Sequence, residues 1–286
     1  MAEFGPSSET SRVTHSALWE AWLRGENLRD VRIVDAHAHL GDLAEFYIPQ
    51  GGSPAAMIDL MDRLGICCCV AAPFAAWAGE PEEGHDAVFR ASQDYPQRFY
   101  GYCVYNPALG VERALEELLR RLAHPAFLGI KIAPSTHGFP VDGADYRPMW
   151  EIAHQRGLVV LSHSWHGTPE DDPWRFEAVG RAYPHARILL GHSGGTPEGM
   201  AAAIEVARKV PNLYLEISGS RVAFGILERM VKAVGAERVV FGSDMPFLDP
   251  RWKLGQVLGA HLSDAEKEKI LGKNAEQLFG LRSKTD

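Results

Sequence analysis

The chain has 286 residues, with 29 Lys and Arg against 37 Asp and Glu, so its formal net charge is −8. Hydrophobic residues make up 46% and charged residues 23%, which is typical of a folded globular protein and excludes an intrinsically disordered one. The negative charge argues against binding to nucleic acid or to an anionic membrane surface, because both repel an acidic protein.

The sequence predicts neither a membrane span nor a secreted disulfide scaffold. The longest uncharged apolar stretch, Ile66–Ala78, is interrupted by Pro73 and is shorter than the roughly 20 residues that a spanning helix needs. The first residues lack the basic segment and apolar run of a secretory signal. Three of the 4 cysteines are consecutive, which indicates reduced thiols. We therefore expect a cytoplasmic location.

The first residues are expected to stand apart from the main domain. Met1–Arg12 is rich in small polar residues and predicts a loose tail, whereas Thr14–Leu23 has apolar residues at helical spacing. We assign residues 1–30 to this tail and leading helix. Residues 31–286 contain no linker or change of composition and are expected to form one domain.

From residue 31 onward, short apolar segments alternate with helix-like segments. The apolar segments start near Val31, Ile66, Phe99, Phe127, Leu158, Arg187, Asn212 and Arg238, at intervals of 25 to 35 residues. Helix starts lie between or after them, at Ser53-Pro54, Thr196-Pro197 and Ser263. Apolar strands that alternate with helices are typical of an α/β protein with a parallel sheet covered by helices.

Eight such units predict a (β/α)8 TIM barrel. The alternative is an open, doubly wound sheet, which usually carries a glycine-rich phosphate turn after its first strand. Here the first strand ends in Asp35-Ala36-His37-Ala38-His39 instead. We therefore favour a closed, single-domain barrel.

Polar side chains mark the carboxyl ends of the predicted strands, where the active sites of barrels lie. His37 and His39 end the first strand, and alternation places both on one face, together with Asp35. The later strand ends carry Lys131 in the fourth, His163 in the fifth, His192 in the sixth and Asp244 in the eighth. Imidazoles and a carboxylate that converge on one cavity predict a metal site.

These residues lie in five motifs, which are VDAHAHLGD, GIKIAPSTHG, LSHSWHG, LLGHSGG and VVFGSDMPF, and the chain closes with ILGKNAEQLFGL. In that order, over Ile33–Leu281, the sequence resembles the amidohydrolase superfamily and, within it, the amidohydrolase-2 (amidohydrolase-related) branch. The resemblance implies that a divalent metal ion is held by His37, His39, His163 and Asp244. It also implies that His192 is either a ligand of a second metal or a catalytic histidine beside the first.

A divalent ion held in this way can lower the pKa of a bound water toward neutrality. We therefore predict a metal-dependent hydrolase of a small ester, lactone or amide. In this reaction Asp244 orients the water and takes its proton, while His192 stabilises charge on the substrate oxygen. Zinc is the expected metal, and manganese, iron and cobalt are alternatives that the same ligands suit.

Lys131 allows more than one interpretation. Similarity to the binuclear amidohydrolases implies a carbamylated lysine that bridges two metals. The single-metal sites of the amidohydrolase-2 branch imply instead an ammonium group that binds a substrate carboxylate or pairs with Asp244, and we favour this second role. A Schiff-base lysine would leave the histidines without a function.

Loops after the strands supply further candidates for a second metal or for the substrate, namely His137, Trp165, His166 and Arg221. Phe74 and Trp77 extend the aromatic character of this rim. An aromatic wall with one arginine suits a small planar or cyclic acid. Each aromatic residue taken singly can equally pack between helices, and Arg221 can equally be a surface residue.

Decarboxylation is the alternative to hydrolysis, because the branch that the sequence resembles includes non-oxidative decarboxylases of aromatic or unsaturated acids on the same metal site. The complete ligand set argues against a barrel that only binds a ligand, and the net charge of −8 argues against a nuclease. The expected partner is a small-molecule substrate, with no nucleic acid and no membrane. A homo-oligomer is compatible with the sequence.

Overall fold

The computed structural model describes residues 16–26, 28, 30–44, 46–221 and 223–281. Its strands are β1 (Ile33–Leu40), β2 (Ile66–Pro73), β3 (Phe99–Val104), β4 (Phe127–Ile132), β5 (Val159–Trp165), β6 (Arg187–Gly194), β7 (Leu213–Glu216) and β8 (Val239–Val240). They form one sheet in the order β1 to β8, and each neighbouring pair is parallel. The predicted (β/α)8 TIM barrel is confirmed, and each strand starts within two residues of its predicted position.

The barrel closes where β1 meets the segment that follows β8. Ala38 forms a parallel bridge with Met245, and the His39 N–H donates to the Met245 carbonyl at 2.7 Å. The Asp244 N–H donates to the His37 carbonyl at 2.8 Å. Closure therefore brings residues from the two ends of the domain into direct contact at the carboxyl end of the barrel.

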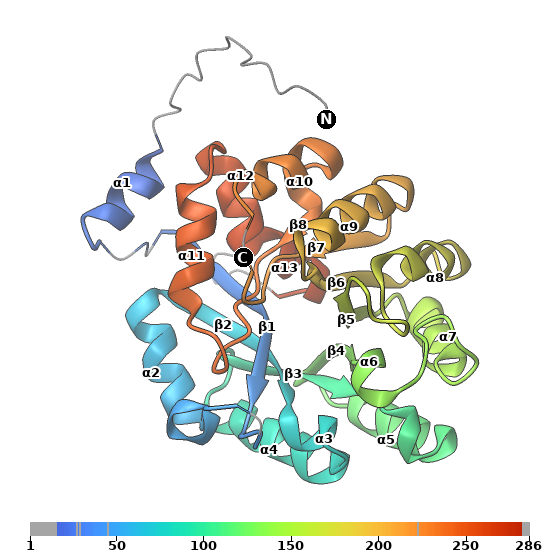
Figure 1. The fold of residues 1–286 in the computed structure, drawn as a ribbon. Helices are drawn as coiled ribbons and strands as arrows, with labels where there is room; N and C mark the ends of the chain where they lie inside the picture. Colours follow the sequence, from blue (N-terminus) through green and yellow to red (C-terminus); the bar gives the residue numbers. More distant parts are fainter. Residues whose placement is uncertain (1–15, 27, 29, 45, 222, 282–286) are drawn as a thin grey trace.

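Helices surround the strands, as the view along the barrel shows (Figure 1). They are α1 (Ala17–Leu23), α2 (Pro54–Leu64), α3 (Phe74–Trp77), α4 (Pro81–Asp94), α5 (Val111–Leu122), α6 (Pro134–His137), α7 (Arg147–Arg156), α8 (Phe176–Ala182), α9 (Pro197–Lys209), α10 (Ile226–Val234), α11 (Pro250–Gly259), α12 (Asp264–Glu268) and α13 (Asn274–Phe279). The predicted leading helix contains α1, which packs against α11. The predicted tail, Met1–Arg12, lies outside the described residues.

The helices begin where the sequence places capping residues. The Ser53 hydroxyl accepts from the Ala56 N–H at the start of α2, and the Thr196 hydroxyl accepts from the Gly199 N–H at the start of α9. Ser263 forms a capping box with Glu266 at the start of α12. Each cap satisfies N–H groups that the first turn of a helix leaves without a partner, so these boundaries follow from local chemistry.

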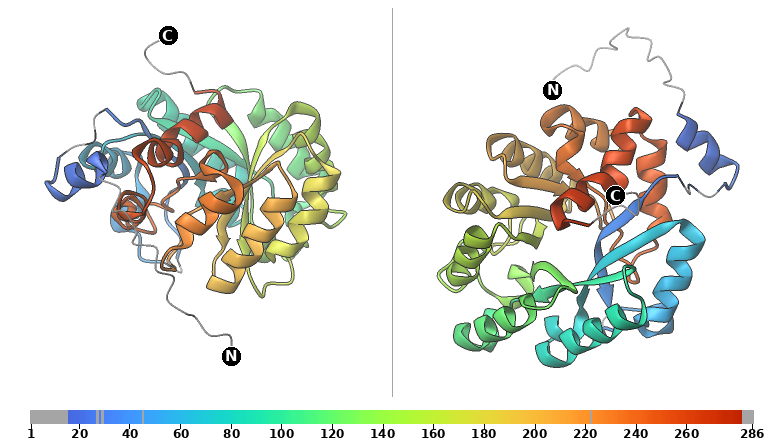
Figure 2. Two further views of the ribbon diagram at one scale, coloured as in Figure 1. Left: turned by 90° about the horizontal axis from the view of Figure 1, so that it is seen from above. Right: turned by 180° about the vertical axis from the view of Figure 1, so that it is seen from behind.

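Apolar side chains pack on both sides of the strands. The barrel interior holds a cluster drawn mainly from the strands, which consists of Val34, Ala36, Cys68, Val70, Ala72, Ala76, Tyr102, Val104, Val159, Leu161, Leu189 and Val240. Ala275 and Leu278 of α13 complete this cluster, and Figure 2 shows the C-terminal helices close to the barrel axis in the view from behind. A larger cluster lies between the strands and the surrounding helices. Among the described residues, no helix has the length and apolar character needed to cross a bilayer.

A bulge in β1 corrects one prediction. The register of β1 against β2 shifts between Asp35 and Ala38, so strict alternation fails there. Ala36 belongs to the interior cluster, although strict alternation from His37 and His39 would turn it outward. The carboxylate of Asp35 instead accepts hydrogen bonds from the backbone N–H groups of His37 and Ser243. Asp35 therefore fixes the backbone of the bulge and does not lie beside the histidine rings.

Candidate active site

Polar residues from several strands meet at the carboxyl end of the barrel. His37 and His39 come from β1, Lys131 from β4, His163 from β5, His192 from β6, and Asp244 follows β8. All except His163 are buried, and its side chain is 19% exposed. Buried imidazoles and carboxylates are costly unless they bind one another or an ion, so this gathering indicates a functional site.

Asp244 lies within hydrogen-bond or near-contact distance of both β1 histidines. Its Oδ1 is 3.0 Å from His39 Nε2 and 3.5 Å from His37 Nε2. The His37 ring centroid is 5.3 Å from that of His39 and 5.0 Å from that of His192. The His163 ring lies next to His192, with their centroids 5.0 Å apart. His37, His39, His192 and Asp244 therefore cluster together, and His163 lies beside His192.

The donor set suits a divalent ion. The ligand atoms of His37, His39 and Asp244 all lie within 4.8 Å of one another, and so do those of His37, His192 and Glu216. Burial lowers the pKa values of His37 and His39, which keeps both rings neutral and able to coordinate. Burial alone raises the pKa of Asp244, but the hydrogen bond from His39 and the neighbouring histidines hold it well below its usual value.

Two of these residues adopt a backbone conformation that side chains disfavour. His192 has φ 61° and Asp244 has φ 68°, both in the left-handed region. Such a conformation costs of order 1–3 kcal/mol for a residue other than glycine, so the surrounding structure must impose it. His192 lies near the end of β6 and Asp244 lies four residues after β8, and both side chains line the cavity.

Lys131 lies inside the same cluster. Its Nζ is 2.9 Å from His37 Nε2 and 5.8 Å from the Trp77 ring centroid. Burial lowers its pKa to about 8, while the negative charges of Asp244, Glu216 and Asp171 act in the opposite direction. Among the described residues, no hydrogen bond or ion pair joins Lys131 to Asp244, so the pairing suggested by the sequence is not formed.

Two buried carboxylates that contact the histidines were not predicted from the sequence. Glu216, at the end of β7, lies 2.7 Å from His37 Nδ1, and Asp171 lies 2.9 Å from His163 Nδ1. Neither carboxylate is measurably exposed. Glu216 could have been found as the polar residue that ends an apolar strand, by the rule applied to the other strands. Asp171 follows β5 in a loop and has no such signal.

A cavity of about 250 Å³ opens onto the cluster. It is lined by His39, Phe46, Phe74, Trp77, His163, Trp165, His192, Gly219, Ser220, Asp244 and Phe247. Phe74 stacks on the His39 ring, with centroids 4.5 Å apart, and Trp165 stacks on His163 at 5.9 Å. The Arg221 guanidinium lies 5.9 Å from the Trp165 ring centroid. The cavity therefore combines flat apolar walls with acid–base groups at its base.

Two of the predicted site residues, His137 and His166, lie away from this cavity and contact other side chains. His137 is buried, and its Nδ1 forms a hydrogen bond with the Tyr146 hydroxyl at 2.9 Å. The His166 side chain is 40% exposed, and its Nδ1 lies 3.0 Å from Asp172. The structure thus places Trp165 in the cavity wall and Arg221 against it, whereas His137 and His166 point to other partners.

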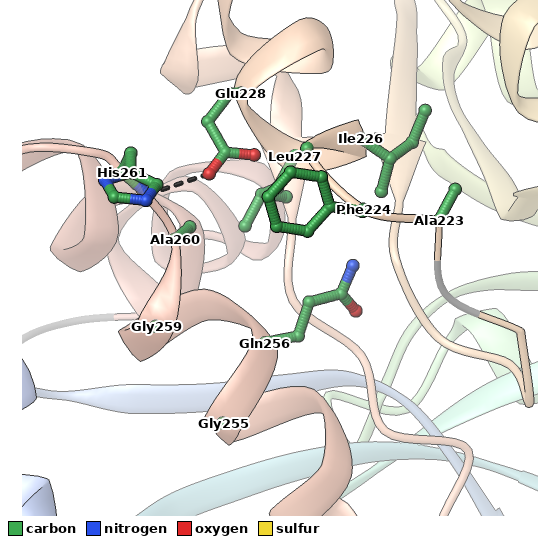
Figure 3. Close-up of a pocket in the computed structure, with 11 residues that line it drawn as sticks. Ala223, Phe224, Ile226, Leu227, Glu228, Gly255, Gln256, Gly259, Ala260 and His261 are labelled. Atoms are coloured by element: carbon green, nitrogen blue, oxygen red, sulfur yellow. Dashed lines mark hydrogen bonds between the residues drawn. The ribbon is translucent and has the colours of Figure 1, made fainter. Parts of the chain in front are cut away.

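A second cavity, of about 220 Å³, lies between the start of α10 and the end of α11 (Figure 3). Its walls are mainly apolar or glycine, and Phe224 is fully exposed beside it. The hydrogen bond drawn there joins the His261 N–H to Glu228 at 2.8 Å. Among the described residues, neither group of candidate metal ligands includes a residue of this cavity. Its lining offers fewer titratable side chains than the cavity at the barrel mouth.

Comparisons with known proteins agree with this geometry. A family model described as amidohydrolase matches residues 34–281. Gamma-resorcylate decarboxylase of Polaromonas sp. strain JS666 is 26% identical over 239 residues, which cover 65% of this chain and 72% of that protein. Four curated relatives match significantly, and the four carry this same name.

Solved structures share the fold at low identity. The 5-carboxyvanillate decarboxylase of Sphingomonas paucimobilis superposes with a TM-score of 0.68 at 16% identity, over 88% of this chain and 100% of that chain. A dihydroxybenzoic acid decarboxylase of Polaromonas sp. JS666, with bound manganese and the inhibitor 2-nitroresorcinol, gives a TM-score of 0.65 at 19% identity, over 88% and 98%. At such identities the superpositions establish the barrel fold and nothing finer.

Proposed function

This chain belongs to the amidohydrolase family, and we propose that it is a metal-dependent, non-oxidative decarboxylase of a hydroxylated aromatic carboxylic acid. One observation carries the proposal: acid–base groups and candidate metal ligands lie at the base of a cavity whose walls are aromatic rings. The curated relatives named above are decarboxylases of such an acid, which supports decarboxylation over the hydrolysis expected from the sequence.

The proposed metal ligands are His37, His39, His163 and Asp244. Their neutral imidazoles and ionised carboxylate match a divalent transition metal, and either manganese or zinc suits them. The manganese in a structural neighbour supports the first of these. When bound, the ion supplies positive charge that attracts the carboxylate and an adjacent hydroxyl of the substrate.

The cavity walls and its cations would hold the substrate. A benzoate ring fits between flat side chains such as Trp77 and Trp165, which exclude water from the reacting carbon. Lys131 lies at the base and Arg221 beside the wall, so both are placed to attract an anionic acid. The apolar volume of about 250 Å³ suits one ring with small substituents.

Asp244 is the proposed acid–base catalyst. Decarboxylation breaks the bond between the ring carbon and the carboxylate carbon, and one proton must then join that ring carbon. Asp244, ionised at rest, takes the proton from an acidic substrate hydroxyl and delivers it to the ring carbon as CO2 leaves. The product departs as a phenolate, which regains a proton from water. His192 accepts a hydrogen bond from a second polar group of the substrate.

The test is a substrate panel on protein loaded with manganese or zinc. The panel holds 2,6-dihydroxybenzoate, 5-carboxyvanillate, and small esters and lactones. We expect CO2 release from at least one aromatic acid, with one deuterium incorporated into the product ring in deuterated water. Hydrolysis of an ester or lactone without any CO2 release would overturn the proposal. His166→Ala, outside the cavity, is the matched control for histidine variants within it.

A further inference from the structure

Glu216 connects His37 and His192, whose ring centroids lie 5.0 Å apart at the barrel mouth. Its Oε2 is 2.7 Å from His37 Nδ1 and accepts the His192 backbone N–H at 3.1 Å. The same oxygen accepts the Ser218 hydroxyl at 2.7 Å, and the other oxygen accepts the Ser218 N–H. Three donors therefore meet Oε2 and one meets Oε1, so the carboxylate accepts from four donors in all.

Ser218 extends this network to the second ring. Its Oγ is 3.0 Å from His192 Nδ1 and 2.9 Å from His37 Nδ1. Both Glu216 and Ser218 are buried. A buried network of this kind is stable only when every donor finds an acceptor, so its protons can be placed by counting.

Two glycines leave the space that the network needs. A Cβ at Gly242 would lie 2.3 Å from Glu216 Oε1 and 2.6 Å from His37 Cβ. A Cβ at Gly219, where φ is +100°, would lie 3.0 Å from His192 Nδ1. Neither position tolerates a side chain without moving these groups. The backbone after β7 and β8 is therefore shaped around the contact of Glu216 and Ser218 with the two rings.

The proton of His37 is fixed from both sides of its ring. Lys131 Nζ lies 2.9 Å from Nε2 and carries only donors when charged, so Nε2 must accept. The ring proton is then on Nδ1, which donates to the Glu216 carboxylate at 2.7 Å. This tautomer leaves a lone pair on Nε2, which accepts from Lys131 and lies 3.5 Å from Asp244 Oδ1.

The proton of His192 follows from the single proton of the Ser218 hydroxyl. A carboxylate is a stronger acceptor than a neutral imidazole, so that proton goes to Glu216. The Ser218 oxygen can then only accept from His192, which places the His192 proton on Nδ1. Among the described residues, no hydrogen bond involves His192 Nε2, and the residue lines the cavity.

We propose that Glu216 and Ser218 are positioning residues that hold His37 and His192 together in the Nδ1–H tautomer, so that both Nε2 atoms carry a lone pair, which can bind a metal ion or accept a substrate proton. The inference rests on the proposed function only for what occupies the cavity. In this tautomer His192 accepts a hydrogen bond from the substrate through Nε2, and Asp244 delivers the proton to the ring carbon.

The experiment reads the tautomers directly, by imidazole nitrogen NMR of histidine-labelled, zinc-loaded protein. The His192 signals are identified by their loss in His192→Gln. We expect His192 to be protonated at Nδ1 in the unchanged chain and to become a mixture of tautomers in Ser218→Ala. Ser218→Thr, which keeps the hydroxyl, should restore the original signals. Ser162→Ala removes another buried hydroxyl, which donates to the His163 carbonyl, and should leave the His192 signals unchanged.

A second readout is the dissociation constant for zinc. Loss of an outer partner of a ligating histidine typically weakens metal binding 10–100-fold, and we expect this for Glu216→Gln. If Glu216→Gln does not fold, the NMR comparison of Ser218→Ala with Ser218→Thr tests the inference by itself. Protonation of His192 at Nε2 in the unchanged chain, or an unchanged tautomer in Ser218→Ala, would overturn the inference. If the NMR signals are as expected but no aromatic acid releases CO2, the proposed function is refuted and the inference about the tautomers still holds.

Discussion

The two halves of the barrel interior differ in chemistry. The half nearer the start of the strands is filled by apolar side chains and closed by Ala275 and Leu278 of α13. The half nearer the carboxyl ends buries ionisable and hydroxyl groups, including His37, His192 and Glu216. The same strands build both halves, so the difference is one of position along each strand.

This difference separates stability from function. Burial of apolar surface favours folding by about 25 cal/mol per Å², whereas burial of polar groups is unfavourable unless each is hydrogen-bonded or charged partners meet. At the barrel mouth the carboxylates of Glu216 and Asp244 are paired with His37 and His39. We therefore expect substitutions in the apolar half, nearer the start of the strands, to change mainly the free energy of unfolding. Substitutions in the half nearer the carboxyl ends should change mainly metal affinity and turnover.

The largest effect is expected for Asp244→Asn. An amide has nearly the shape of the carboxylate but cannot take a proton, so kcat should fall about 10²–10⁴-fold, the usual contribution of a general acid–base group. The midpoint of thermal unfolding should change little. Steady-state kinetics and calorimetry check both. Retention of full turnover would show that the proton comes from another group.

The complementary substitution in the apolar half of the barrel interior is Leu189→Ala. Leu189 is fully buried in the interior cluster, so the substitution should lower the free energy of unfolding by about 2–5 kcal/mol. Urea unfolding measures this, and zinc affinity measured on the same variant should stay within about twofold. A large loss of affinity with unchanged stability would contradict the separation of the two halves.

The third prediction concerns Asp35, which joins β1 to the β8 end between the two halves. Burial raises its pKa from 3.8 to about 7, despite the hydrogen bonds from Ser243 and the His37 N–H. Between these pH values the folded protein keeps a proton that the unfolded chain has released. Its contribution to stability should therefore fall as pH rises from about 4 to about 7, by on the order of 4 kcal/mol at most.

The check is urea unfolding of metal-free protein at several pH values in that range. Asp35→Asn cannot titrate, so its stability should vary less with pH than that of the unchanged chain. Equal pH dependence in both proteins would show that Asp35 is ionised throughout.

Much of the architecture was readable from residue patterns. The strand starts and the capped helix starts follow from apolar runs and from residues such as Ser53 and Thr196, because both signals are local. The strand-end positions of His163 and Asp244 followed from the same reasoning. His166 is half exposed and contacts Asp172, and proximity in sequence to Trp165 could not show which way the loop turns.

The sequence by itself determined the eight repeated units and the polar residue at most strand ends, because strand alternation and helix capping act over a few residues. Only the tertiary structure decided which of these residues touch. Glu216 and His37 are 179 positions apart, and their contact depends on how the barrel closes. The bulge at Asp35 likewise depends on its bonds to Ser243, 208 positions away. Hydrogen bonds between such distant residues leave no periodic pattern in the chain, since they arise from the packing of strands that have already formed.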